Sequence, residues 1–127
     1  MDDEKRLPNN HFLPKEIVEQ LLSNGRKQAN VKGTKQEIDF KPVVKLFILG
    51  SQAKWLLTEI EPSNLDIAFG LCDLGMGFPE LGYVSLSEFA DVEKNLGVRI
   101  EYDRTFKADK TLSQYKDDAR RNQGIGV

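Results

Sequence analysis

Four acidic side chains beside predicted turns could do chemistry if the fold brings them together: Glu59, Asp66, Asp73 and Glu80. Oxygen ligands of this kind suit a hard cation such as Mg²⁺, and paired carboxylates in a cleft could act as general acid and base. Carboxylates beside turns more often cap the turn or stay solvated. We therefore expect no catalytic residue, metal or cofactor, and we keep a metal- or ligand-binding enzyme centred on Asp73 and Glu80 as an alternative.

The glycine-rich stretch Gly75-Met76-Gly77 follows a predicted strand, where backbone amides can bind an anion. It lacks the G-x-G-x-x-G spacing of a dinucleotide site, and no lysine follows it as in a phosphate-binding loop. The nearest charges, Asp73 and Glu80, repel phosphate. We interpret the stretch as a tight turn, for which glycine is needed in any case.

Cys72 and His11 are the only cysteine and the only histidine of the chain. A nucleophilic cysteine needs a base in contact with it, but Cys72 lies in the most apolar predicted strand and His11 in an N-terminal arm. We expect Cys72 to be a small core residue. A single residue of each type also excludes the usual zinc sites and an intramolecular disulfide.

The net charge of −2 conceals blocks of opposite sign. Residues 26–54 carry a net charge of +5, and residues 55–103 carry −8. If folding keeps the blocks apart, each could steer a charged partner; if the strands interleave them, the surface is mixed. The acidic candidates for partner binding are Glu59, Glu61, Asp66, Asp73 and Glu80. The basic candidates, for a protein partner or nucleic acid, are Lys41, Lys45, Lys54, Lys116, Arg120 and Arg121.

Trp55, the only tryptophan, could anchor a partner or stack on a base. Leu56 and Leu57 beside it indicate a strand that meets apolar surface on both faces. We therefore favour a core position for Trp55.

The apolar pattern predicts three helices and four or five strands. Helical spacing predicts a helix over 14–24 with a cap at Gly25. Residues 26–41 then form a loop or a flexible segment that orders only on binding. Runs rich in β-branched and aromatic residues predict strands over 43–48, 67–72 and 98–102, with a brief pairing at 83–84. Residues 53–60 fit a strand or a short helix, and we favour the strand because a turn and another strand follow at once. A Ser-x-x-Glu capping box at Ser85 starts a helix that ends near residue 95, and Thr111 caps a last helix.

Hairpin spacing between the strands, with helices before, inside and after them, predicts an α+β fold with a mostly antiparallel sheet. The strand over 67–72 is apolar at both odd and even positions, so both of its faces are covered and we place it centrally. The 98–102 strand alternates apolar and charged residues, so we place it nearer an edge. We expect a flexible arm over 1–12, a single domain over 13–121 and a loose tail over 122–127.

The cellular location follows from what the sequence lacks. No apolar run approaches the roughly 20 residues of a membrane span. The N-terminus does not have the order of a signal peptide, and one cysteine suits a reducing compartment. We therefore expect a cytoplasmic protein that makes no membrane contact.

Four stretches of the chain are similar to a known family: PVVKLF (42–47), WLLTE (55–59), FGLCDLG (69–75) and PELGYVSL (79–86). They resemble the uncharacterised bacterial domain-of-unknown-function family 2958, and the resemblance extends from about Leu13 to Arg121. It supplies no catalytic residue and no ligand. It implies a context, because such proteins look like products of conjugative plasmids, integrative elements and phages. Lys54 and the long polar stretch 26–41 depart from the family pattern.

Our main hypothesis is a non-enzymatic accessory protein of a mobile genetic element or phage that binds a host- or element-encoded protein or nucleoprotein complex. One form is counter-defence, in which the acidic stretch 55–103 faces the nucleic-acid groove of a host complex and excludes its substrate. The alternative is direct nucleic-acid binding through residues 26–54 and the last helix, although a pI of about 5.5 is low for that role. The sequence leaves the oligomeric state open.

Overall fold

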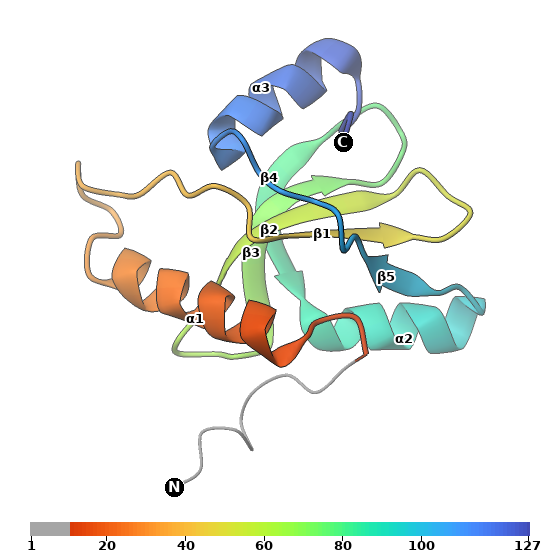
Figure 1. The fold of residues 1–127 in the computed structure, drawn as a ribbon, viewed down its shortest axis with the longest axis horizontal. Helices are drawn as coiled ribbons and strands as arrows, with labels where there is room; N and C mark the ends of the chain where they lie inside the picture. Colours follow the sequence, from red (N-terminus) through yellow and green to blue (C-terminus); the bar gives the residue numbers. More distant parts are fainter. Residues whose placement is uncertain (1–10) are drawn as a thin grey trace, which may run out of the picture.

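Five antiparallel strands form one sheet in the computed structural model, which describes residues 11–127 (Figure 1). The strands are β1 (Val44–Ile48), β2 (Lys54–Ile60), β3 (Ile67–Asp73), β4 (Glu80–Ser85) and β5 (Ile100–Tyr102). The helices are α1 (Lys15–Ala29), α2 (Leu86–Leu96) and α3 (Leu112–Asn122). The order across the sheet is β4-β3-β2-β1-β5. The predicted α+β fold with an antiparallel sheet is confirmed.

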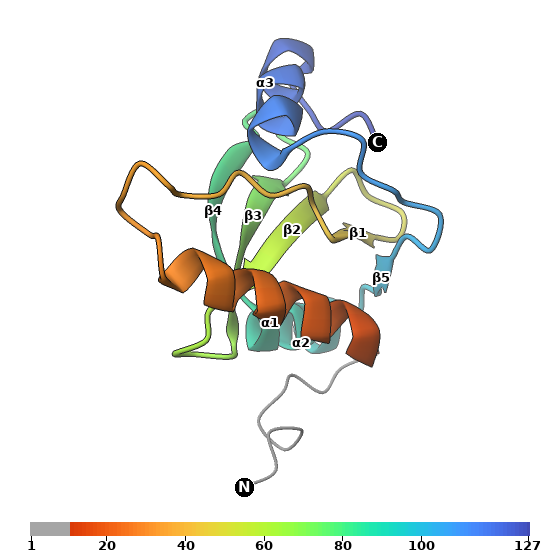
Figure 2. The same cartoon turned by 60° about the vertical axis from the view of Figure 1, so that its left-hand side comes forward.

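The helices divide between the two faces of the sheet. α1 and α2 pack on one face, which we call the α1/α2 face, and α3 packs on the other, the α3 face (Figure 2). Alternation along β2 sends Trp55 and Leu57 to the α1/α2 face and Leu56 to the α3 face. Helices cover both faces, which is why β2 and β3 are apolar at successive positions.

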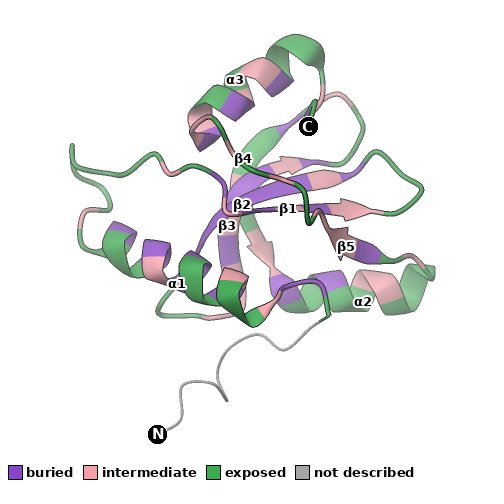
Figure 3. Cartoon of the chain, in the orientation of Figure 1, coloured by how far each residue is buried: buried purple, intermediate pink, exposed green. Residues whose placement is uncertain are grey.

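β2 occupies the centre of the sheet, and all but its first residue are buried (Figure 3). The strand that we expected at the centre, β3, is interior but lies one place away from it. β5 lies at an edge, as expected. The brief pairing predicted at 83–84 is longer in the structure, because all six residues of β4 pair with β3.

α1 continues beyond the predicted cap at Gly25, which lies inside the helix. Gly25 faces β2 so closely that a Cβ atom there would lie 1.8 Å from the carbonyl oxygen of Ile60. On the same part of the helix, Asn24 donates a hydrogen bond to the Thr58 carbonyl oxygen (2.9 Å). Gln28 donates to the carbonyl oxygen of Ile38 (2.7 Å). These tertiary contacts carry the helix into the stretch that was predicted as loop.

The cap of α2 comes from another part of the chain. Ser85 stands at the N-cap position, but its side chain makes no capping bond, so the predicted capping box is wrong. The carboxylate of Asp66, in the turn between β2 and β3, accepts hydrogen bonds from the Ser87 amide (2.8 Å) and the Ser85 hydroxyl (2.6 Å). A carboxylate suits the positive end of the helix dipole. At α3 the predicted cap is confirmed, because Thr111 and Gln114 form a capping box.

Both ends of the described chain contact the core. Phe12, in the arm that was expected to be flexible, is fully buried. Ile125, in the tail that was expected to be loose, is buried against residues of α3. The rest of the predicted arm, residues 1–10, lies outside the described residues. Within residues 11–127, no helix combines the length and the hydropathy needed to cross a membrane.

Candidate functional site

The acidic candidates occupy separate places in the fold. Asp73 and Glu59 are buried, Glu61 and Asp66 are half-buried, and Glu80 is exposed. Asp66 serves as the cap of α2. In the part of the chain that the structure describes, no three His, Cys, Asp or Glu side chains lie close enough together to hold a metal ion.

Asp73 and Lys54 hold the C-terminal tail between them. They are neighbours across β3 and β2. The Asp73 carboxylate accepts a hydrogen bond from the Ile125 amide (2.8 Å), and the Lys54 ammonium group donates one to the Ile125 carbonyl oxygen (3.1 Å). The other Asp73 oxygen accepts a hydrogen bond from the Gly75 amide (2.8 Å). Only 3% of Asp73 is exposed, so its carboxylate works inside the protein.

Glu59 and Glu61 lie near the C-terminal half of α1. Burial raises the pKa of the Glu59 carboxyl, against the opposing effect of hydrogen bonds from Thr58 and Gln28. Glu61 instead pairs with Lys32 at the surface (3.3 Å). Neither carboxylate is free to meet a partner in this arrangement.

Most basic candidates are engaged. The ion pairs are Lys45 with Asp103 (3.3 Å), Lys116 with Asp117 (3.5 Å) and Arg121 with Asp118. Lys41, before β1, and Arg120, on α3, are exposed. Acidic residues thus stand among the basic ones around α3 and β1, and the local surface is mixed rather than uniformly positive.

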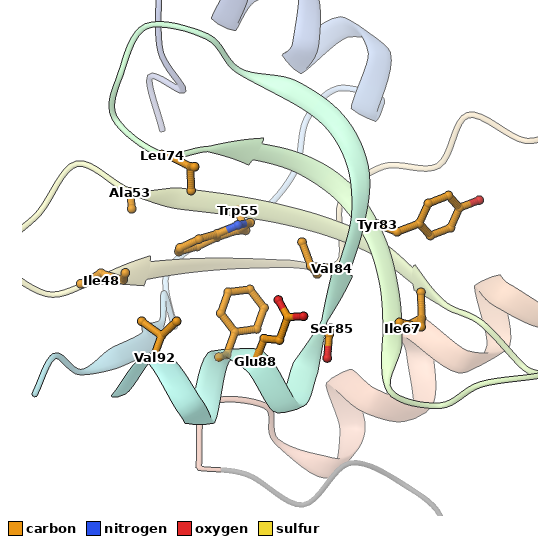
Figure 4. Close-up of a pocket in the computed structure, with 11 residues that line it drawn as sticks. Ile48, Ala53, Trp55, Ile67, Leu74, Tyr83, Val84, Ser85, Glu88 and Val92 are labelled. Carbon is orange, nitrogen blue, oxygen red and sulfur yellow. The ribbon is translucent and has the colours of Figure 1, made fainter. Parts of the chain in front are cut away.

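A cleft of about 580 Å³ opens on the α1/α2 face between α2 and the sheet (Figure 4). We call it the α2 cleft. Glu88, Phe89 and Val92 of α2 line one side, and Leu74 and residues of β4 line another. Trp55 also lines it, although only 6% of its surface is exposed. Trp55 is therefore a core residue, as favoured.

The aromatic rings at the cleft fix one another. The Trp55 ring meets the Phe89 ring edge to face, with 4.9 Å between the centroids. Phe12 packs against the other side of this pair, 5.6 Å from the Phe89 centroid and also edge to face. Such pairs add to the stabilisation that burial provides. The wall of the α2 cleft is thus formed before any ligand arrives.

The loop between β3 and β4, residues 74–79, presents apolar side chains to solvent. Its first residue, Leu74, lines the α2 cleft, whereas Phe78 lines a separate pocket with Glu80 and with Arg120 of α3. The exposed fractions are 59% for Leu74, 68% for Met76 and 80% for Phe78. Gly75 and Gly77 adopt positive φ angles, which glycine does without strain. The Asp73 carboxylate accepts a hydrogen bond from the Gly75 amide at one end of the loop, and Pro79 is buried at the other end. The loop is therefore held at both ends while its large side chains remain in water.

Cys72 and His11 do not form a nucleophile and base. Burial, with a smaller contribution from the charge of Glu80, raises the pKa of the Cys72 thiol to about 11. His11 bonds to the carboxylate of Glu93 (2.8 Å). The thiol is therefore protonated at neutral pH, and it lacks the thiolate character that a nucleophile needs.

Sequence reasoning missed both the cleft and the exposed side chains of the loop. It interpreted residues 75–77 only as a turn. The available signal was the presence of three large apolar residues in a loop rich in glycine and proline, where polar residues are usual. The cleft has no such signal, because β1, β2, β4 and α2 all contribute residues to it.

Comparison with known proteins supplies a family. The family model described as "Protein of unknown function (DUF2958)" matches residues 12–126, nearly the whole chain. No curated protein and no solved structure matches the chain significantly. The function must therefore be argued from the cleft and the loop.

Proposed function

We propose that this chain, which belongs to the DUF2958 family, is a non-enzymatic accessory protein that binds a protein partner. The proposed binding surface combines the α2 cleft with the exposed side chains of Leu74, Met76 and Phe78. We call this the cleft surface. The observation that carries the proposal is the exposure of these three side chains on one loop that leads from a formed cleft, at Leu74, to a second pocket, at Phe78.

A partner would remove the apolar side chains of the loop from water. Burying a Leu, Met or Phe side chain contributes about 1.5–3 kcal/mol. Single exposed apolar residues are common, but a group of them beside a cleft is typical of an interaction site. Because Asp73 and Pro79 hold the loop, little conformational entropy is lost when it binds. Phe78, the most exposed of the three, is the expected anchor.

The family context suggests where the partner comes from. Resemblance to products of plasmids, integrative elements and phages leads us to propose a partner encoded by the host or by the element. A host complex that targets nucleic acid is one such partner. Glu80, which lines a pocket with Phe78 and Arg120, is the one exposed acidic candidate at the cleft surface, and Glu88 lines the cleft itself. A counter-defence role would depend on these two residues rather than on the whole acidic block.

The two other hypotheses have less support. Direct nucleic-acid binding would rely on Lys41 and Arg120, because the other basic candidates contact acids or, for Lys54, the tail. An enzyme centred on Asp73 and Glu80 would need both carboxylates in one cleft. The strand register places Asp73 on the α3 face, opposite Lys54, and Glu80 on the α1/α2 face, opposite Cys72.

The proposal is tested by capture of the partner with a matched pair of variants. The chain carries an N-terminal tag, the lysate comes from the natural host, and nuclease is added. Phe78→Ser removes the proposed anchor. Leu96→Ser is the control, because Leu96 is 71% exposed at the end of α2 and belongs neither to the cleft lining nor to the loop between β3 and β4. Thermal unfolding establishes that both variants remain folded.

We expect a stoichiometric protein that survives nuclease and is retained by wild type and Leu96→Ser but lost by Phe78→Ser. Equal capture by Phe78→Ser would contradict the proposed surface. Recovery only through nucleic acid would favour the nucleic-acid hypothesis. That hypothesis has its own test, a gel shift at low salt with single- and double-stranded DNA and RNA.

A further inference from the structure

β4 is the longer of the two edge strands of the sheet. Its six residues pair with β3 in an unbroken register, whereas β5 at the other edge has three residues. Natural edge strands are usually protected by lysine, proline, a bulge or shortness. β5 is short, but β4 contains no lysine, no proline and no bulge. Within residues 11–127, the outward N–H and C=O groups of β4 have no strand beside them.

We propose that the partner adds an extended segment to β4 as a sixth strand, with apolar side chains in the α2 cleft and basic residues on either side of them. This inference rests on the proposed function, because it specifies how the cleft surface binds. In such strand addition, main-chain hydrogen bonds provide affinity and pockets for alternate side chains provide specificity. Tyr83, Val84 and Ser85 of β4 line the cleft, so the edge and the cleft are continuous.

Gly82 leaves space beside the edge. The register places Glu80, Gly82 and Val84 on the α1/α2 face. A Cβ atom at Gly82 would meet no atom within 4 Å. A neighbouring strand can therefore bring a branched aliphatic side chain over Gly82 and next to Val84, where it would face the cleft.

The charges of the site select basic residues beside the apolar ones. Glu88 lines the cleft just beyond the end of β4. Glu80 stands at the start of β4, where it lines a separate pocket with Phe78 and Arg120; both carboxylates are exposed. The described lining of the cleft contains no lysine or arginine. Two cationic residues separated by aliphatic ones would match these carboxylates. A second copy of this chain is a poorer occupant, because antiparallel pairing of two β4 edges would bring the carboxylates of both copies together.

The test uses synthetic peptides and the full chain. The parent peptide is Lys-Thr-Val-Thr-Ile-Thr-Lys, whose alternate residues place two lysines and two aliphatic side chains on one face. A counterpart carries glutamate in place of both lysines. Two derivatives of the parent, isomers of each other, are N-methylated on alternate residues. Only one of them loses the N–H groups on the edge that pairs with β4. Binding is measured by titration, and amide hydrogen exchange by NMR.

We expect the lysine peptide to bind about tenfold more tightly than the glutamate peptide. One N-methylated isomer should bind like the parent and the other should fail. Amides of β4 should exchange more slowly with peptide bound, and those of β5 should not change. The double variant Glu80→Lys with Glu88→Lys should reverse the charge preference, whereas Asp117→Lys, the same change on exposed α3, should leave it intact.

Three outcomes would overturn strand addition: no peptide binds, the lysine and glutamate peptides bind equally, or both N-methylated isomers behave alike. Self-association of the chain through β4, seen as a change in molar mass with concentration, would also overturn it in favour of a second copy. The capture experiment separates these failures from failure of the proposed function. A partner lost only with Phe78→Ser supports the cleft surface even if no peptide adds to β4.

Discussion

Replacing Asp73 by alanine is expected to destabilise the fold, because its carboxylate accepts hydrogen bonds from two backbone N–H groups. The Ile125 amide is buried with its bond to Asp73 at 2.8 Å, and leaving a buried donor without a partner costs about 1–3 kcal/mol. The Gly75 amide lies on an exposed loop and can bond to water instead, so its loss costs about 0.5–1 kcal/mol. The two ranges sum to about 1.5–4 kcal/mol, and we expect a loss near the middle of that range, about 2–3 kcal/mol.

Urea denaturation followed by circular dichroism measures this loss, and the midpoint of thermal unfolding should fall by about 8–12 °C. Glu80→Ala is the control, because this exposed carboxylate should change stability by less than about 0.5 kcal/mol. Deleting residues 124–127 should remove most of the effect of Asp73→Ala, since the Ile125 amide is then absent. If Asp73→Ala has the same free energy of unfolding as wild type but no longer captures the protein partner, the structural role assigned to Asp73 is wrong.

Three further predictions follow from local environments. Gly25→Ala should cost about 2–3 kcal/mol in urea denaturation, because its Cβ would overlap the Ile60 carbonyl oxygen; unchanged stability would refute the close approach of α1 to β2. Burial raises the folded pKa of Glu59 above its unfolded value, so the wild type gains stability as pH falls through the folded pKa. Glu59→Gln should therefore stabilise the chain at pH 7 and lose that advantage by pH 4, and a variant less stable at pH 7 would contradict this. With a thiol pKa of about 11, folded Cys72 should react with a thiol reagent at pH 8 on the order of a hundredfold more slowly than the unfolded chain, and equal rates would show an accessible thiolate.

The strands were predictable because their signal is local. Val44–Ile48 is rich in β-branched and aromatic residues, and turn residues separate the strands that follow. The end of α1 was not predictable in this way. Asn24 and Gln28 are polar and would not by themselves predict a helix. They continue it because Asn24 donates to the Thr58 carbonyl oxygen, in a distant strand, and Gln28 donates to the Ile38 carbonyl oxygen, in the loop that follows the helix.

The candidate site was only partly predictable, because residue type does not determine exposure. Asp66 and Asp73 were chosen as carboxylates beside turns. Asp66 caps a helix, in line with the favoured interpretation, whereas Asp73 is buried and holds a tail, which the sequence did not indicate. Met76 and Phe78 were passed over, because an apolar residue in a sequence suggests the core. Only the structure shows that this loop extends beyond the sheet.

The order of the strands has a consequence for synthesis of the chain. β1 to β4 are joined by successive hairpins, so all three of their pairings are available once the ribosome has passed Ser85. The outer edge of β1 must wait for β5, and Leu56 and Leu71 on the α3 face must wait for α3. A nascent or truncated chain that ends after α2 therefore exposes a bare strand edge and an apolar sheet face, which makes it prone to aggregate. The last elements to be made thus complete the fold and cover the β1 edge and the α3 face, while the β4 edge stays open in the part of the chain that the structure describes.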